Sequence, residues 1–372
     1  MYRRTTTTAL ALGLAGALAL AACGGSSSSA KPTTTTTGLD PSKVTTPATL
    51  RLGYFPNVTH APALVGIQGG GFAKTLGPKV TLEPKAFNAG PEAVQAIFSG
   101  ALDATFIGPS PSITAYQQSQ GSAIRIVSGA ALGGAYLVVK PEITKAADLK
   151  GKKVASPQLG NTQDVALRTW LQSKGLKTDT SGGGDVSVVP QENSLTLQAF
   201  KTNQISGAWV VEPWATRLVE EGGGKVLVDE ASLWPKGRYV TTNLVVRTAY
   251  LREHPDVIRN LIRAEAAAIK VIQTDPTTAK ALTNQAITAV TTKSLPQNLI
   301  DASFEHITFT LDPVPTALRR SAKDAQRVGL LGPVNLNGIY ELSLLNGVLE
   351  AQGKAPVVDT PEKVAATTGA KP

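Results

Sequence analysis

From Thr49 onward, short runs of β-branched and aliphatic residues alternate with longer segments whose apolar residues recur at helical spacing. The first strands are expected at residues 50–54, 80–83, 104–107 and 124–127. The helices between them are expected at residues 61–71 and 92–99, and from Ser112 to about Gln120. This alternation is typical of parallel sheets covered by helices, so the pattern predicts an α/β fold.

A second unit of the same kind begins near Tyr136. Its strands are expected at residues 136–139, 153–156, 186–189, 208–211 and 226–228, with helices at 162–174, 194–201 and from Pro213. A strand at residues 239–247 then leads into helices expected at 255–274, 277–292, 298–307, 316–329 and 338–353. The pattern therefore predicts two α/β units and a long helical C-terminal part.

The length of the chain also favours two units. Its 372 residues exceed the roughly 250–300 at which single hydrophobic cores stop growing. A chain that leaves the first unit near Gly134 and returns near Thr241 crosses twice between the lobes, which produces a hinge beside a cleft. We expect lobe 1 to comprise residues 48–134 and 242–355, and lobe 2 to comprise residues 135–241.

The first 23 residues have the pattern of a lipoprotein signal peptide. Arg3 and Arg4 precede an apolar run that ends in Leu-Ala-Ala-Cys, which places the single cysteine, Cys23, where a lipobox needs its thiol. We therefore expect removal of residues 1–22 and lipidation of Cys23, which holds the exported protein on the outer face of the cell membrane. An ordinary signal peptide is the alternative, and the route of export, Sec or twin-arginine, stays open.

A low-complexity segment precedes the predicted lobes. Residues 24–37 are dominated by glycine, serine and threonine, a composition that cannot bury enough apolar surface to fold. We expect residues 23–47 to form a disordered tether and residues 356–372 a flexible tail. No later segment has the roughly 18 consecutive apolar residues of a spanning helix, so the pattern predicts an anchored rather than an integral protein.

Composition removes several classes of function. One cysteine cannot form an internal disulfide, and the three histidines match no metal-binding spacing, so we expect no metal and no cofactor. The formal net charge is +9, and the loss of Arg3 and Arg4 with the leader would leave +7. The basic residues are scattered without interleaved aromatics, which argues against nucleic acid as a partner.

Candidate binding chemistry lies in four strand-to-helix turns, at residues 54–60, 108–112, 158–162 and 212–214. In open α/β sheets, ligands bind beyond the carboxyl ends of strands, where helix N-termini present free amides. For a small anion whose charge is spread over several oxygens, several neutral donors are more suitable than one buried lysine. The sequence offers such donors at Ser110, Ser112, Asn161 and Thr162.

Each candidate also has a purely structural alternative. Ser110 and Ser112 could simply cap a helix. Asn161 could act only as a cap, with Asp164 three residues later completing a capping box. His60 could lie on the surface near a helix start, and Trp214 could belong to the core.

Glu212 is the anomaly among the candidates. A carboxylate repels an anion unless the ligand also carries a cation, such as an amine. Glu212 could instead cap a helix or bridge the lobes to an arginine.

Four segments together resemble the solute-binding proteins of sulfonate, taurine and nitrate ABC importers. They are Arg51-Leu52-Gly53-Tyr54, residues 100–112, Asp148-Leu149-Lys150-Gly151-Lys152-Lys153-Val154-Ala155 and residues 209–214. The resemblance extends over about residues 49–352. It implies a two-lobed type II periplasmic-binding fold, usually a monomer, that captures a small anion and delivers it to a membrane permease with its ATPase.

The resemblance also assigns residues by position. It places Gly53 and Asn57 at the turn of the first lobe, Ser110 and Ser112 as hydroxyl donors, and Gly160, Asn161 and Thr162 at the anion turn of the second lobe. Glu212 and Trp214 match the hinge-side wall. With His60, these are the residues that we expect to bind the ligand.

The ligand itself stays open at this point. We expect a small organic anion of the aliphatic sulfonate or taurine type, with nitrate, bicarbonate or a pyrimidine vitamin precursor as alternatives. Catalysis is not expected, because enzymes that resemble this fold use cysteine-dependent segments and Cys23 lies in the lipobox. A surface sensor or adhesin would need a partner surface that the sequence does not reveal.

Overall fold

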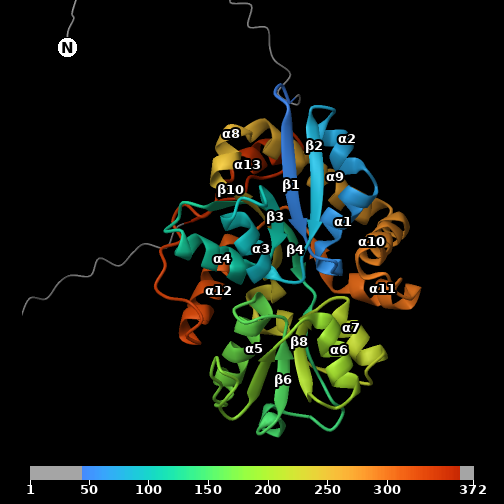
Figure 1. Cartoon of the computed structure of the whole chain (residues 1–372), viewed down its shortest axis with the longest axis vertical. Coiled ribbons are helices and arrows are strands. Elements are labelled where there is room, and N and C mark those ends of the chain that lie inside the picture. Colours follow the sequence, from blue (N-terminus) through green and yellow to red (C-terminus); the bar gives the residue numbers. More distant parts are fainter. Residues whose placement is uncertain (1–43, 361–372) are drawn as a thin grey trace, which may run out of the picture. The chain divides into compact units, whose positions relative to one another are not determined.

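The computed structural model describes residues 44–360, and this part of the chain contains two mixed β-sheets (Figure 1). The six-stranded sheet has the order β11-β4-β10-β3-β1-β2 and the five-stranded sheet the order β7-β6-β8-β5-β9. The first sheet is built from β1 (Ala48–Tyr54), β2 (Val80–Ala86), β3 (Ala104–Ile107), β4 (Ile124–Gly133), β10 (Val240–Arg247) and β11 (Ile307–Phe309). The second is built from β5 (Ala135–Val139), β6 (Lys153–Ser156), β7 (Ser187–Pro190), β8 (Gly207–Val211) and β9 (Lys225–Asp229). The α/β prediction is therefore confirmed.

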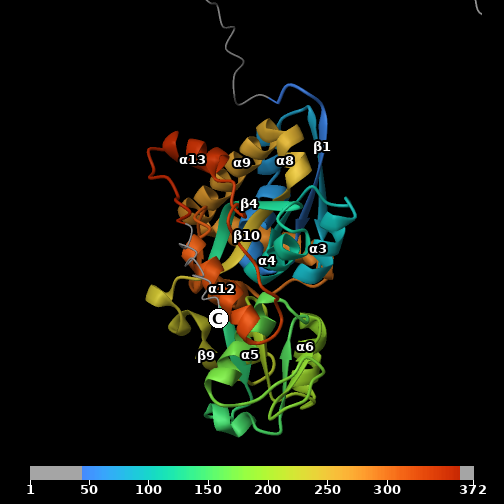
Figure 2. The ribbon, with the colours of Figure 1, turned by 90° about the vertical axis from the view of Figure 1, so that its left-hand side faces the viewer.

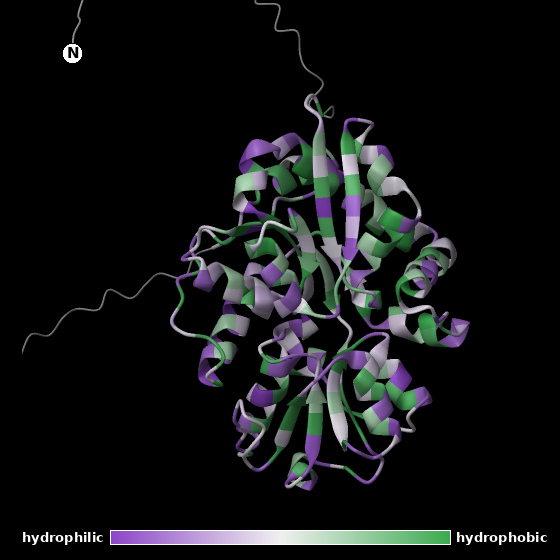
Figure 3. Ribbon diagram, viewed as in Figure 1, coloured by the Kyte–Doolittle hydropathy of each residue, from purple (hydrophilic) through white to green (hydrophobic). Residues whose placement is uncertain are grey.

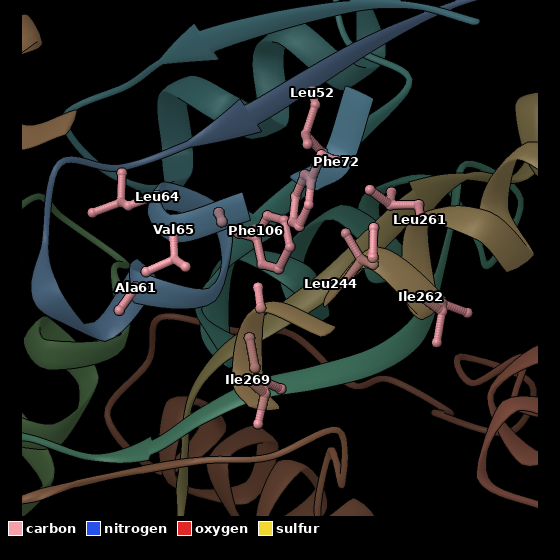
Figure 4. Close-up of a cluster of buried hydrophobic side chains, with 14 of the residues drawn as sticks. Leu52, Ala61, Leu64, Val65, Phe72, Phe106, Leu244, Leu261, Ile262 and Ile269 are labelled. Carbon is pink, nitrogen blue, oxygen red and sulfur yellow. The ribbon is translucent and has the colours of Figure 1, made fainter. Parts of the chain in front are cut away.

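Helices cover both faces of the first sheet, because its strands bury apolar residues on both sides. One face packs against α1 (Ala61–Gln68), α2 (Gly71–Leu76), α9 (Pro255–Thr274) and α13 (Ser343–Glu350), while α10 (Pro276–Thr291) packs on α1 and α9, and α11 (Gln297–Glu305) packs on α10. The other face packs against α3 (Gly90–Phe98), α4 (Pro109–Gln118) and α12 (Pro315–Arg327), while α8 (Thr248–Glu253) follows β10. Phe72 and Phe106 stack at 6.3 Å between ring centroids in the centre of the first core, beside Leu244 and Leu261 (Figure 4).

The second sheet follows the same principle on a smaller scale. Its faces pack against α5 (Thr162–Ser173) on one side and against α6 (Asn193–Lys201) and α7 (Trp214–Glu220) on the other. Trp209 of β8 is fully buried, and its ring centroid lies 6.1 Å from that of Trp170 of α5. Hydrophobic residues are visible along the strands of both sheets, while hydrophilic residues alternate with them along the surrounding helices (Figure 3).

The sheets are mixed, which corrects the prediction of parallel sheets. β1, β2 and β3 are parallel, but β10 runs antiparallel to both β3 and β4. In the second sheet β5 runs antiparallel to β8 and β9. The physical reason is the double crossing of the chain, since β4 continues almost directly into β5 and β10 returns in the opposite sense. An alternation of strands and helices does not reveal the direction of such crossing strands.

Several element bounds also differ from the predicted ones. β4 continues six residues beyond the expected end at Val127, and β11 begins at Ile307, where a helix was expected to end. The expected helix at residues 338–353 begins only at Ser343. The short helix α8 was not anticipated.

The first crossing between the sheets contains two glycines in a left-handed conformation. Gly133 ends β4 with φ of +81°, and Gly134 precedes β5 with φ of +73°. Residues with a Cβ rarely adopt this conformation, so the crossing depends on glycine. The second crossing lies between the end of β9 at Asp229 and the start of β10 at Val240.

The ordered body extends beyond the expected lobe bounds at both ends. Val44 is buried in the first core, although residues up to 47 were assigned to the tether. At the other end, Asp359 pairs with Arg319 at 2.6 Å, although the flexible tail was expected from residue 356. The predicted signal peptide, Cys23 and most of the tether lie outside the described residues. Within residues 44–360, no helix has the length and apolar character needed to cross a membrane.

One buried carboxyl group in lobe 1 yields a stability prediction. Glu265 of α9 is fully buried, and neither carboxyl oxygen has a hydrogen-bond partner among the described residues. Burial raises the pKa of Glu265 well above its ordinary value, and the nearby Ser128 hydroxyl opposes this rise without cancelling it. Above about pH 4.5 the unfolded chain therefore releases a proton that the folded protein retains. The contribution of this group to the free energy of unfolding consequently falls as pH rises.

Replacing Glu265 by methionine is expected to raise the free energy of unfolding at pH 8 by about 1–3 kcal/mol, the usual cost of an unsatisfied buried polar group. The gain should shrink toward pH 4.5, where the unfolded wild-type chain increasingly holds the proton as well. Urea unfolding of both proteins between pH 4.5 and 8 measures the effect. An equal gain at every pH would contradict the assignment.

Candidate functional site

The N-termini of two helices from different lobes meet at the centre of the described body. Asn161 is the N-cap of α5, and its side chain accepts the Thr162 N–H at 2.8 Å. The Ser110 N–H at the start of α4 points to the Thr162 Oγ1 at 3.4 Å. A Cβ at Gly108, the N-cap of α4, would overlap the Thr162 hydroxyl, so only glycine permits this approach.

Beside this contact lies a cavity of about 20 Å³, which we call the amide cavity because asparagine and glutamine side chains dominate its polar lining. Its polar lining residues are Asn57, Thr59, His60, Asn88, Asn161, Thr162, Gln163, Asn193 and Thr241. No lysine, arginine, aspartate or glutamate is among its lining residues. The amide cavity therefore offers neutral hydrogen-bond groups contributed by both lobes.

His60 contributes as a neutral side chain. It is buried, and burial lowers its pKa from 6.5 to about 3. Its Nδ1 accepts the Phe55 N–H at 3.3 Å, which assigns the proton of the neutral ring to Nε2. His60 is thus a hydrogen-bond donor without a charge at neutral pH.

Hydrogen bonds between the lobes hold the cleft closed. The Trp214 Nε1–H donates to Asn57 Oδ1 at 3.0 Å, and the Val58 N–H donates to the Glu212 carbonyl oxygen at 3.0 Å. At the rim, Gln158 Nε2 donates to Glu92 Oε1 at 2.9 Å. The structure therefore represents a closed arrangement with little free volume at the amide cavity.

A buried ion pair between Asp164 and Arg168 supports the turn at residues 158–162 of lobe 2. Asp164 Oδ1 accepts hydrogen bonds from Ser156 Oγ at 2.7 Å and from Arg168 Nε at 3.0 Å. Asp164 Oδ2 accepts the Gly160 N–H at 2.9 Å. The capping box expected between Asn161 and Asp164 is not formed, because the carboxylate binds Gly160 instead of the Asn161 N–H.

Glu212 lies away from the lining of the amide cavity. Its Oε2 accepts the Thr216 N–H at 3.1 Å and the Ser303 Oγ–H at 3.3 Å, which joins the first turn of α7 to α11 of the other lobe. Burial raises its pKa, and these hydrogen bonds oppose the rise. The geometry matches the capping alternative, with a serine rather than an arginine as the partner in the other lobe.

The remaining predicted residues divide between contact and support. Asn57, His60, Asn161 and Thr162 lie together at the amide cavity. Gly53 lies in β1, where a Cβ would overlap the Thr105 hydroxyl, and the Ser112 hydroxyl donates to the Gly108 carbonyl oxygen at 2.8 Å. Trp214 holds Asn57 in place, and Gly160 belongs to the turn supported by Asp164. Ser110 opens onto a second cavity.

Sequence reasoning missed five polar lining residues, namely Thr59, which lies inside the predicted turn at residues 54–60, and Asn88, Gln163, Asn193 and Thr241. Asn88 and Asn193 each follow the carboxyl end of a strand, β2 and β7, so the rule that identified the other turns could have found them. Gln163 and Thr241 carry no comparable signal. Within residues 44–360, no group of three or more histidine, cysteine, aspartate or glutamate side chains could hold a metal ion.

Solved structures with the same fold include proteins that bind small anions. The alkanesulfonate-binding protein SsuA from Xanthomonas axonopodis pv. citri, bound to MOPS, superposes with a TM-score of 0.67 at 19% identity, covering 81% of this chain and 100% of that protein. The periplasmic nitrate-binding protein NrtA from Synechocystis PCC 6803 gives a TM-score of 0.67 at 18% identity, covering 82% and 88%. At these identities the likeness establishes the two-lobed fold.

Sequence comparison identifies the family. The taurine-binding periplasmic protein of Escherichia coli (strain K12) is 30% identical over 198 residues, which cover 53% of this chain and 59% of that protein. The chain thus spans a little over half the length of the curated relatives that it matches. The model of the NMT1-like family matches residues 44–337, which include both sheets and the amide cavity. The chain therefore belongs to the NMT1-like family.

Proposed function

We propose that this protein is the substrate-binding component of an ABC importer and captures a small organic anion of the sulfonate or taurine type. The lobes close on the anion, and the closed form delivers it to the permease and its ATPase. The lobes comprise residues 48–134 with 242–355 and residues 135–241. The protein acts as a monomer without a cofactor and without catalysis.

We further propose that the protein is exported and held at the outer face of the membrane by a lipid on Cys23. The lipobox pattern at residues 20–23 supports this anchor. The periplasmic location named for the taurine-binding relative supports export.

The observation that carries the proposal is the amide cavity, which is closed by both lobes and lined by uncharged polar groups. Asn57, His60, Asn161 and Thr162 would contact the anion there. Neutral donors suit a delocalised anion, because hydrogen bonds to a charged group contribute roughly 1.5–3 kcal/mol each. Four such bonds are enough to offset the desolvation of the anion and to supply about 8 kcal/mol of binding free energy, which corresponds to a micromolar Kd.

The small volume of the amide cavity supports a hinge mechanism. Its 20 Å³ is enough for about one water molecule, so a sulfonate enters only if the lobes separate or rearrange. The crossing at Gly133 and Gly134 is where such a rotation would be absorbed. The same small volume favours nitrate or bicarbonate as a second candidate ligand.

Thermal-shift measurements on the protein from Cys23 onward, without the lipid, test this function. Taurine, propanesulfonate, nitrate, bicarbonate and a pyrimidine vitamin precursor are compared, and we expect a sulfonate to raise the melting temperature most. A ligand at 100 times its Kd adds about 2.7 kcal/mol of stability. Stabilisation by neutral or cationic compounds alone would overturn the proposal.

Asn193→Ala provides the matching variant, because this side chain lines the cavity and its Nδ2–H groups can donate to an anion. Loss of one hydrogen bond to the ligand should weaken binding about 10- to 150-fold. Gln273→Ala removes an exposed amide on α9 and serves as the control. Equal affinities of the two variants would place the ligand elsewhere.

A further inference from the structure

A second cavity, of about 180 Å³, lies on the other side of the contact between Ser110 and Thr162. We call it the α5–α12 chamber, because these two helices from different lobes form its walls, and Figures 1 and 2 both place them side by side. The segment around Trp234, which follows β9, closes a third side. Its volume equals about six water molecules, enough for a small organic molecule.

Two buried hydroxyl groups on residues that line the chamber have no hydrogen-bond partner among the described residues. They are the Ser110 Oγ of α4 and the Thr169 Oγ1 of α5. The Ser110 side chain as a whole is 3% exposed. Each unsatisfied buried polar group is costly, so an occupant of the chamber that reached either hydroxyl would gain a hydrogen bond.

The charges at the chamber leave a positive excess. Arg320 and Arg327 of α12 share one carboxylate, since Asp324 Oδ1 accepts from Arg327 at 3.0 Å and Asp324 Oδ2 lies 3.6 Å from Arg320 Nε. Burial raises the pKa of Glu230, on the opposite wall, to about 7, although Trp209 and Trp234 donate to its carboxylate. Near neutral pH the arginines therefore outweigh the acidic groups that line the chamber.

Most of the remaining lining is apolar, with Ser173 and Ser321 as the exceptions. Trp170 and Val165 project from α5, and Leu233 and Trp234 face them from the segment after β9. Arg320 lies over the Trp234 ring at 4.3 Å from its centroid, so the positive group borders the aromatic wall. A ligand that matches these surfaces combines an apolar body with an acidic group.

We propose that the α5–α12 chamber is a second binding site, distinct from the amide cavity, for an organic sulfonate or carboxylate with an aromatic or branched apolar body. The body lies between Trp170 and Trp234, and the acidic group meets Arg320. Because both lobes contribute walls, an occupant stabilises the closed arrangement.

Calorimetric titration with benzenesulfonate tests the site. Methanesulfonate, which keeps the acid but lacks the body, and benzyl alcohol, which keeps the body but lacks the charge, should bind at least tenfold more weakly. Binding should also change the tryptophan fluorescence, since two of the four tryptophans line the chamber. Trp234→Phe should reduce that signal.

Two variants address the chamber from different sides. Ala166→Phe fills it from α5, and Arg320→Gln removes the charge excess; each should weaken benzenesulfonate binding at least tenfold. Lys74→Gln, an exposed charge on α2, is the control and should bind like wild type. Melting temperatures establish that each variant is folded.

The outcomes separate this proposal from the function proposed above. Benzenesulfonate binding that is lost in both chamber variants supports the chamber even if taurine, propanesulfonate and nitrate all fail to bind. If benzenesulfonate does not bind wild type at millimolar concentration, or binds both variants as tightly as it binds wild type, the chamber proposal is overturned, whatever the result at the amide cavity.

Discussion

Replacing Asp164 by alanine is expected to lower the free energy of unfolding by about 3–5 kcal/mol, the usual cost of leaving one member of a buried ion pair without its partner. The side chains of Asp164 and Arg168 are 0% and 1% exposed, so water cannot replace the lost carboxylate. The variant also loses the acceptor of the Ser156 hydroxyl and of the Gly160 N–H. The turn before Asn161 should therefore loosen together with the helix that it begins.

Urea unfolding of the ligand-free protein measures this loss. Asp164→Leu combined with Arg168→Met should recover most of it, because removing both charges leaves none buried and unpaired. Glu221→Ala is the matched control, since it breaks an ion pair of the same spacing between Arg217 and Glu221 at a partly exposed site. Its cost should stay below about 1 kcal/mol. A similar cost at both sites would refute the role assigned to burial.

Gly108→Ala is expected to weaken ligand binding about 5- to 150-fold while each lobe keeps its stability. The backbone of Gly108 has φ of −70° and ψ of 162°, which any residue adopts, so the substitution does not strain lobe 1. Its Cβ would overlap the Thr162 hydroxyl of the other lobe. Overpacking of this kind costs about 1–3 kcal/mol, and here only the closed arrangement carries that cost.

Small-angle X-ray scattering measures how far the lobes close. Titration with the anion that stabilises the protein most in the thermal-shift screen measures the affinity. The radius of gyration should increase in Gly108→Ala. Adding Thr162→Ala should restore closure, because the Thr162 Cβ lies 3.4 Å from the position of the new methyl group, an ordinary contact. Wild-type scattering and affinity in the single variant would mean that the contact between the two helices does not limit closure.

Much of the fold and part of the site were predictable from local patterns. Asn161 precedes an apolar stripe with helical spacing, and the structure places it at the N-cap of α5. The turns that carry Asn57, His60 and Thr162 were predicted between an expected strand and the helix that follows it. Such turns are visible in a sequence because strand ends and helix starts depend on neighbouring residues. Family resemblance led to the same turns.

Other features depended on contacts between distant residues. Glu212 accepts a hydrogen bond from Ser303, 91 positions later, so no local pattern could separate a cap from a ligand contact. Ser110 and Thr162 were both expected at one anion site, yet Ser110 opens onto the α5–α12 chamber and not onto the amide cavity. The side of a helix start that faces a cavity is decided by how the helix packs against the other lobe.

The sequence by itself determined the fold class, the double crossing near Gly134, most element positions and the neutral donor chemistry of the turns, because all of these follow from hydrophobic period and from single-residue preferences. The tertiary structure decided the antiparallel strands, the support of Gly160 by Asp164 and the division of the cleft into two cavities. These features arise where segments far apart in the chain exclude water from one another, and that geometry exists only once both lobes are folded and in contact.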